Sequence, residues 1–234
     1  MEYSQKKRYQ EEITMEAKRI LCYGDSNTFG SIPGSGARLH EDKRWTGICR
    51  NLLGDGYRIL EEGLPGRTTV FDDPCDPFMN GLTSLGYILQ SQKPLDLVVL
   101  CLGANDVKFA NAYSSASGID TLLHHLLNAN TIYPGSCGIF RDTPRVLLIA
   151  PPPIPPEIDI AMADTRFVGT APISQEFGRL YRKVALSRGV AFLDGGEIAS
   201  LSPIDCLHLD EEGHRKMGTA VAQSIRDIFE KEDC

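Results

Sequence analysis

Five short apolar runs recur along the chain, separated by longer stretches that are apolar on one face only. The runs are typical of strands buried on both sides, and they lie at 19–24, 57–61, 95–102, 145–150 and 190–193. Between and after them, apolar residues recur at helical spacing over 42–53, 82–90, 120–130, 173–187 and 212–229. Strands that alternate with helices predict a parallel sheet covered by helices.

The order of these elements predicts an α/β fold. Since crossovers between parallel strands are right-handed, few topologies remain, and we expect a flavodoxin-like three-layer sandwich. Its five-stranded parallel sheet has the order 2-1-3-4-5, with helices on both faces. In this order the turns after the first three strands, at Ser26, Gly66 and Asn105, meet at one edge of the sheet. Ligands bind at the carboxyl ends of such strands, so this edge is the expected site.

The polar and proline-rich stretches define the domain organisation. Residues 1–17 are rich in charge and form an N-terminal extension, and residues 18–234 form a single domain. The five prolines between Pro151 and Pro156 exclude a helix or a central strand there, and they start an irregular excursion that runs to about Pro172. This excursion could wall a substrate pocket or supply a contact between subunits.

Composition narrows the partners and the compartment. The net charge of -7 comes without a stripe of Lys and Arg, so we expect no nucleic-acid partner. No apolar stretch approaches the roughly 18 residues that span a bilayer, and the charged N-terminus lacks the core of a signal peptide. Seven cysteines without a Cys-x-x-Cys pair fit a reducing compartment, and we expect a cytoplasmic protein without membrane contact.

Ser26, in the turn after the first strand, is the candidate nucleophile. Ser and Asp also favour turns and helix N-caps, so Gly24-Asp25-Ser26 alone does not establish chemistry. A serine nucleophile needs a base within reach and a group that orients that base. His208 is the best placed histidine, because Asp205 three residues earlier can fold back and accept its Nδ1 proton, leaving Nε2 for Ser26.

Two further turns offer hydrogen-bond donors for a developing oxyanion. Gly63-x-x-Gly66 follows the second strand, and Gly103-x-Asn105-Asp106 follows the third. A glycine lets its backbone N–H approach a ligand closely. An asparagine amide offers two N–H groups without becoming a competing base.

Together these blocks resemble the SGNH, or GDSL-type, hydrolase superfamily, over about residue 18 to the end of the chain. The four blocks are Gly24-Asp25-Ser26-Asn27, Gly66, Gly103-Ala104-Asn105-Asp106 and Asp205-Cys206-Leu207-His208. Other stretches look like its bacterial arylesterase and acyltransferase branch: Ile20-Leu21-Cys22-Tyr23, Arg44-Trp45-Thr46-Gly47, Glu61-Glu62-Gly63-Leu64-Pro65-Gly66-Arg67-Thr68-Thr69 and Ala150-Pro151-Pro152-Pro153.

The resemblance implies a role for each matching residue. It implies Ser26 as the nucleophile, His208 as the base and Asp205 as the residue that orients it. The oxyanion hole would comprise the Ser26 and Gly66 backbone N–H groups and the Asn105 side chain. Asp25 and Asp106 would serve as structural hydrogen-bonding residues. This branch can have alanine in place of Gly66, which offers the same N–H. The resemblance implies neither a metal nor a cofactor. It does imply self-association.

The leading hypothesis is therefore a serine esterase that hydrolyses small soluble carboxylic esters through an acyl-enzyme intermediate. Alcohols or peroxide could compete with water if the pocket is narrow and apolar, giving acyltransferase activity. A related alternative is a deacetylase of sugars or metabolites with the same triad. A flavodoxin-like binding module without turnover is an alternative of another class. A thiol hydrolase that uses Cys206 beside His208 is a third.

Overall fold

A parallel five-stranded sheet forms the centre of the protein, in a computed structural model that describes residues 16–230. The order is β2-β1-β3-β4-β5, and every neighbouring pair is parallel. The strands are β1 (Lys18–Gly24), β2 (Tyr57–Gly63), β3 (Leu97–Cys101), β4 (Val146–Ala150) and β5 (Ala191–Asp194). The predicted fold class and strand order are confirmed. Most of the charged extension, predicted over residues 1–17, lies outside the described residues.

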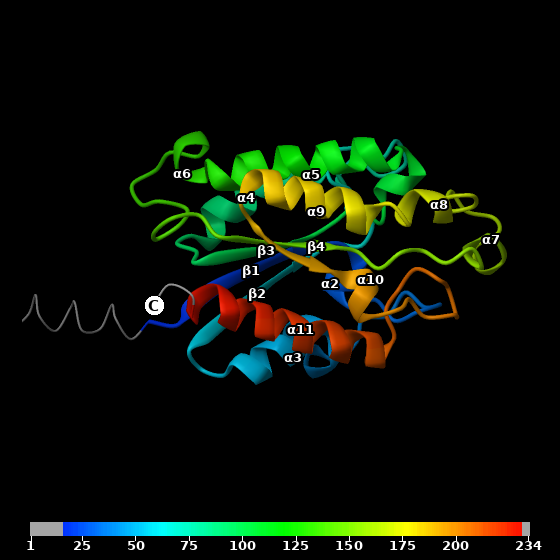
Figure 1. The fold of residues 1–234 in the computed structure, drawn as a ribbon, viewed down its shortest axis with the longest axis horizontal. Helices are drawn as coiled ribbons and strands as arrows, with labels where there is room; N and C mark the ends of the chain where they lie inside the picture. Colours follow the sequence, from blue (N-terminus) through cyan, green and yellow to red (C-terminus); the bar gives the residue numbers. More distant parts are fainter. Residues whose placement is uncertain (1–15, 231–234) are drawn as a thin grey trace, which may run out of the picture.

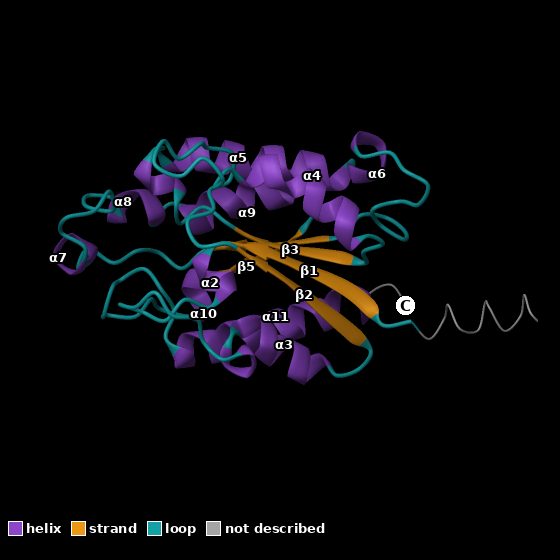
Figure 2. Ribbon diagram, turned by 180° about the vertical axis from the view of Figure 1, so that it is seen from behind, coloured by secondary structure: helices purple, strands orange, loops and turns teal. Residues whose placement is uncertain are grey.

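Helices cover both faces of the sheet (Figures 1 and 2). One face carries α4 (Gly81–Gln92), α5 (Ala112–Leu127) and α9 (Phe177–Arg188), and the other carries α3 (Trp45–Leu53) and α11 (Glu211–Glu230). The short elements are α2 (Ser26–Phe29), α6 (Ala129–Ile132), α7 (Ile158–Ala161), α8 (Ala171–Ser174), α10 (Gly195–Ile198) and the 3-10 helices η1 (Glu41–Lys43) and η2 (Asp106–Lys108).

Alternate residues of β1 face the two helical layers. Leu21 and Tyr23 are fully buried in the hydrophobic core with α4, α5 and α9, whereas Ile20 and Cys22 are fully buried in the core with α3 and α11. Successive side chains of a strand point to opposite faces, so a sheet covered on both sides buries every position. The continuous apolar runs in the sequence have this cause.

Several predicted helices differ from the observed ones; the helix predicted over 42–53, for example, is divided between η1 and α3. Helix α5 begins at Ala112, eight residues before the predicted start, where the Asn111 side chain accepts a hydrogen bond from the Ser114 N–H. Its first turns pack through small residues such as Ala116, which an apolar pattern does not reveal. The helix predicted over 173–187 is two helices, α8 and α9. No helix between residues 16 and 230 combines the length and hydrophobicity needed to cross a membrane.

Ion pairs connect the excursion after β4 to the loop that follows β2. Two nitrogens of Arg166 donate to the two carboxylate oxygens of Asp73, each at 2.9 Å, and the Lys108 ammonium lies 3.2 Å from the same carboxylate. Asp73 is buried, and a buried charge is costly unless it is paired. The two cations balance its negative charge. Self-association through this excursion stays a prediction.

His214 caps helix α3 from helix α11. Arg44, at the N-cap of α3, makes no capping hydrogen bond with its side chain. Instead, the Trp45 N–H donates to His214 Nδ1 at 3.2 Å. Nδ1 must therefore be unprotonated. His214 is fully buried, and desolvation lowers its pKa from 6.5 to about 4.

Acid should destabilise the fold through His214. The unfolded chain binds the histidine proton more tightly than the folded chain, so this contribution to stability is complete above about pH 6.5 and falls as the pH drops toward 4. Between pH 7.5 and 4 the free energy of unfolding of the wild type should fall by about 3 kcal/mol relative to that of His214→Gln. Urea unfolding at several pH values measures this difference, and a pH-independent difference would contradict it.

Candidate active site

Ser26 begins helix α2 at the carboxyl end of β1. The Asp25 side chain caps this helix and accepts from the Asn27 N–H at 3.0 Å. Gly24 is required by space, because a Cβ there would lie 2.0 Å from Thr28 Oγ1 and 2.8 Å from the Cys101 carbonyl. The turn therefore packs closely against the end of β3 and places Ser26 at the carboxyl edge of the sheet.

Asp205 and His208 form a hydrogen-bonded pair in the loop before α11. Asp205 Oδ2 lies 2.7 Å from His208 Nδ1, and Asp205 Oδ1 accepts from the backbone N–H of His208 at 3.0 Å. A tight turn through Cys206, whose φ is 56°, makes both contacts possible. The aspartate thus fixes the ring orientation and directs Nε2 away from itself.

The Asp205 carboxyl stays ionised in this setting. Partial burial raises its pKa, but hydrogen bonds from the His208 ring and from the backbone N–H groups of His208, Gly34 and Leu207 outweigh burial and hold the pKa well below its usual range. An ionised carboxylate stabilises an imidazolium formed beside it.

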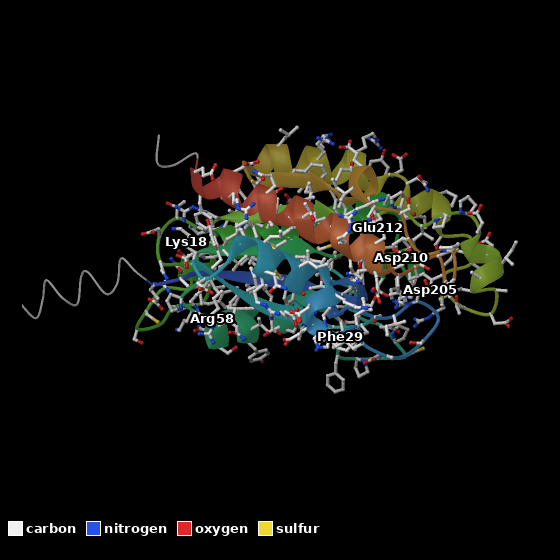
Figure 3. The ribbon with its side chains drawn as sticks, turned by 90° about the horizontal axis from the view of Figure 1, so that it is seen from below. Lys18, Phe29, Arg58, Asp205, Asp210 and Glu212 are labelled. Atoms are coloured by element: carbon white, nitrogen blue, oxygen red, sulfur yellow. The ribbon has the colours of Figure 1, made fainter. Side chains whose placement is uncertain are left out.

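Asn27 ties the His208 loop to the serine turn. Its Nδ2 donates to the Leu207 carbonyl at 3.1 Å, and its Oδ1 accepts from the Leu209 N–H at 2.8 Å. Both neighbours of His208 are therefore bound to the residue that follows Ser26. In Figure 3, Phe29 of α2 and Asp205 lie toward the same end of the molecule, away from Lys18 and Arg58 near the starts of β1 and β2.

The two turns with potential donors adjoin each other. Gly66 has a φ of +87°, and a Cβ there would lie 3.0 Å from Met79 Sδ. Asn105 is buried, and its amide donates to the Arg67 carbonyl at 3.2 Å. The second N–H of that amide makes no hydrogen bond within residues 16–230, so it is available to a ligand.

Two buried carboxyl groups brace this edge. Asp106 accepts from the Thr69 N–H at 2.8 Å and from the Thr69 hydroxyl at 2.6 Å, which joins the second turn to the third. Burial raises the pKa of Asp106 to about 7 and that of Asp25 to about 6. Both residues make the structural hydrogen bonds expected of them.

The other candidate groups are engaged elsewhere. His125 on α5 hydrogen-bonds through Nδ1 with the Tyr133 hydroxyl after α6 at 3.0 Å, and His40 accepts from the Asp42 N–H at the start of η1. Burial raises the pKa of the Cys206 thiol, which disfavours the thiolate that a cysteine nucleophile needs. Among residues 16–230 no three His, Cys, Asp or Glu side chains are grouped so that they could hold a metal ion.

The sequence predicted Ser26, Asp205, His208, Gly66 and Asn105 as site residues. Ser26 is the first residue of the short helix α2, and the other four lie in loops or turns. The sequence predicted no role for Asn27, although that residue follows Ser26 directly. An asparagine after a serine is a common turn residue, so the sequence alone did not indicate a further role. That role depends on the tertiary contact with Leu207 and Leu209. A hydroxyl, an oriented imidazole and N–H donors at one edge suit nucleophilic attack on a carbonyl carbon.

Comparisons with known proteins agree with this chemistry. Residues 22–216 match the GDSL-like lipase/acylhydrolase family. A carbohydrate acetylesterase from Sinorhizobium meliloti superposes with a TM-score of 0.83 at 37% identity, over 90% of this chain and 99% of that chain. An aryl esterase from M. smegmatis superposes with a TM-score of 0.81 at 36% identity, over 90% and 99%. No curated protein sequence matches the chain.

Proposed function

Because the chain belongs to the GDSL-like lipase/acylhydrolase family and is a serine ester hydrolase, we propose that it hydrolyses small soluble carboxylic esters through an acyl-enzyme intermediate. The observation that carries this proposal is the 2.7 Å contact between Asp205 and His208, in a loop bound by Asn27 to the serine turn. The hypothesis of a binding module without turnover is dropped, since the family is one of hydrolases.

In the acylation step, Ser26 Oγ attacks the ester carbonyl carbon while His208 Nε2 removes the hydroxyl proton. The ionised Asp205 stabilises the imidazolium that results. The imidazolium then gives its proton to the leaving alcohol or phenol, and the acyl group remains on Ser26. Water, activated by the same imidazole, attacks the acyl-enzyme and releases the acid.

The oxyanion receives hydrogen bonds from the Ser26 and Gly66 backbone N–H groups and from the Asn105 amide. The Arg67 carbonyl takes one Asn105 N–H at 3.2 Å and thereby fixes the direction of the other. Donors fixed before the reaction stabilise the developing charge without reorganisation. Gly66 holds its turn at a positive φ, a conformation that costs glycine little.

Acetate esters of sugars are a second candidate substrate class. The 37% identity to a carbohydrate acetylesterase over 99% of that chain supports it. The chemistry at Ser26 is the same, because only the leaving alcohol differs. Acyl transfer would follow if an alcohol or peroxide replaced water in the second step.

A panel of esters tests the function and separates these classes. We expect kcat/KM to be highest for acetate and to fall along the series p-nitrophenyl acetate, butyrate and octanoate. Release of acetate from acetylated sugars, compared with phenyl acetate, ranks the two alcohol classes. Equal rates across the acyl series would contradict the preference for small acyl groups, and no hydrolysis of any ester would contradict the proposed function.

A further inference from the structure

Arg67 is a buried cation beside the candidate site, and ester hydrolysis as proposed assigns no role to its side chain. It directly follows Gly66, and only 4% of it is exposed. Burying a guanidinium is costly unless its hydrogen bonds and charge are compensated. The partners of Arg67 are therefore informative.

The guanidinium of Arg67 binds the serine turn. Its Nη1 donates to the Gly24 carbonyl at 2.8 Å and also to the Glu62 carbonyl. Its Cζ lies 4.2 Å from the centre of the Tyr23 ring, in a cation–π contact. Gly24 stands two residues before Ser26, so the guanidinium fixes the backbone that carries the nucleophile.

The backbone of Arg67 binds the donor turns. Its carbonyl accepts from the Asn105 amide at 3.2 Å. Its N–H donates to the Leu64 carbonyl at 3.1 Å and closes the turn that contains Gly66. One residue thus contacts the serine turn through its side chain and both donor turns through its main chain.

Two other side chains, those of Asn27 and Asp106, also link segments of the site, and each link stays within one half of it. Asn27 joins the serine turn to the His208 loop, and Asp106 joins the third turn to Thr69 beside the second. Between these halves the Leu64 N–H donates to the Gly24 carbonyl at 3.1 Å, and the Arg67 guanidinium donates to the same carbonyl from its side chain. We propose that Arg67 is a positioning residue for the proposed ester hydrolysis, which sets the Ser26 turn at the correct distance from the Gly66 and Asn105 donors.

Arginine suits this position better than lysine. Its rigid, planar guanidinium holds Nη1 in a fixed direction toward the Gly24 and Glu62 carbonyls, and it stacks on the aromatic face of Tyr23. An ammonium group is a point charge on a flexible stem, which would hold the Gly24 carbonyl less rigidly.

The variant Arg67→Met keeps the length of the aliphatic stem and removes the guanidinium. Because a misplacement of about 1 Å in an active site can cost on the order of 100-fold in rate, we expect kcat for p-nitrophenyl acetate to fall roughly 10- to 100-fold at similar KM. Should Arg67→Met fail to fold, Arg67→Lys is measured instead, with at least a tenfold loss expected. A kcat within twofold of the wild type in a folded variant would overturn the inference.

Arg19 provides the matched control. Its guanidinium also donates to two backbone carbonyls, those of Pro94 at 2.9 Å and Gln92 at 2.8 Å, but at the amino end of β1. Arg19→Met should lower the unfolding temperature without changing kcat. A general loss of rigidity would instead lower kcat in both variants, and that result would count against the positioning role.

A double-mutant cycle with Asn105→Ala tests how Arg67 acts. If Arg67 acts partly through the Asn105 donor, the double variant should lose less than the product of the two single losses. Fully multiplicative losses would overturn this link. The inference depends on the proposed function but fails separately: full activity in Ser26→Ala refutes the function, whereas normal kcat in Arg67→Met with an inactive Ser26→Ala refutes only the role of Arg67.

Discussion

Replacement of Ser26 by alanine is expected to lower kcat for p-nitrophenyl acetate by on the order of 10⁶-fold, the size of the loss seen when a serine nucleophile is removed. The hydroxyl oxygen is the atom that bonds to the acyl carbon, and alanine has no atom that can take its place. The substitution removes one oxygen from the first residue of α2, whose cap is the side chain of Asp25, so the fold should persist. Stopped-flow or spectrophotometric rates of p-nitrophenolate release measure the effect.

Cys206→Ala is the control for this result. Cys206 lies two residues from His208, but its thiol is buried and burial raises its pKa. Alanine and cysteine meet the same constraint at the φ of 56° found there, so the loop should be retained. We expect nearly full activity in this variant. Loss of activity in Cys206→Ala together with full activity in Ser26→Ala would establish a thiol mechanism instead.

Replacement of Asn105 by alanine is expected to lower kcat by roughly 10²- to 10³-fold, which corresponds to about 2.7 to 4 kcal/mol of transition-state stabilisation. The amide is fixed by the Arg67 carbonyl, and its remaining N–H would donate to the oxyanion. That charge develops only during the reaction, so KM should change little. Steady-state kinetics on the same ester measure both constants.

Asn130 offers a comparable amide away from the site. Its Nδ2 donates to the Phe140 carbonyl at 3.4 Å, and its Oδ1 accepts from the Phe140 N–H at 3.0 Å. Asn130→Ala should therefore cost stability and leave kcat unchanged. Unchanged kcat in Asn105→Ala would refute the placement of Asn105 in the oxyanion hole.

The fold could be predicted because the strands are buried on both faces. In β3 and β4 every residue is buried, and both were visible as continuous apolar runs. The start of α5 was not visible, because its first half packs through Ala112, Ala116 and Gly118. A periodicity of large apolar residues cannot report such contacts.

The candidate site could be predicted only in part. Ser26 and Asn105 belong to short motifs at strand ends, His208 belongs to a short motif before the last helix, and their chemistry suggested their roles. Arg67 and Asn27 act through contacts with residues distant in sequence, such as the bond from Asn27 to Leu207. The sequence also predicted no role for His214, because its hydrogen bond with the Trp45 N–H joins residues 169 positions apart. No local pattern encodes these pairs.

The central claim is that Ser26 carries the acyl group and that His208 activates the Ser26 hydroxyl. A p-nitrophenyl phosphonate tests this most directly, because the attacking oxygen displaces p-nitrophenolate and the phosphonyl group stays bound. Mass spectrometry of the digested wild type should find one label per chain, on the peptide at Ser26, with much slower labelling in His208→Ala and none in Ser26→Ala. A label on any other residue, or an unlabelled Ser26 in an enzyme that hydrolyses esters, would contradict the account.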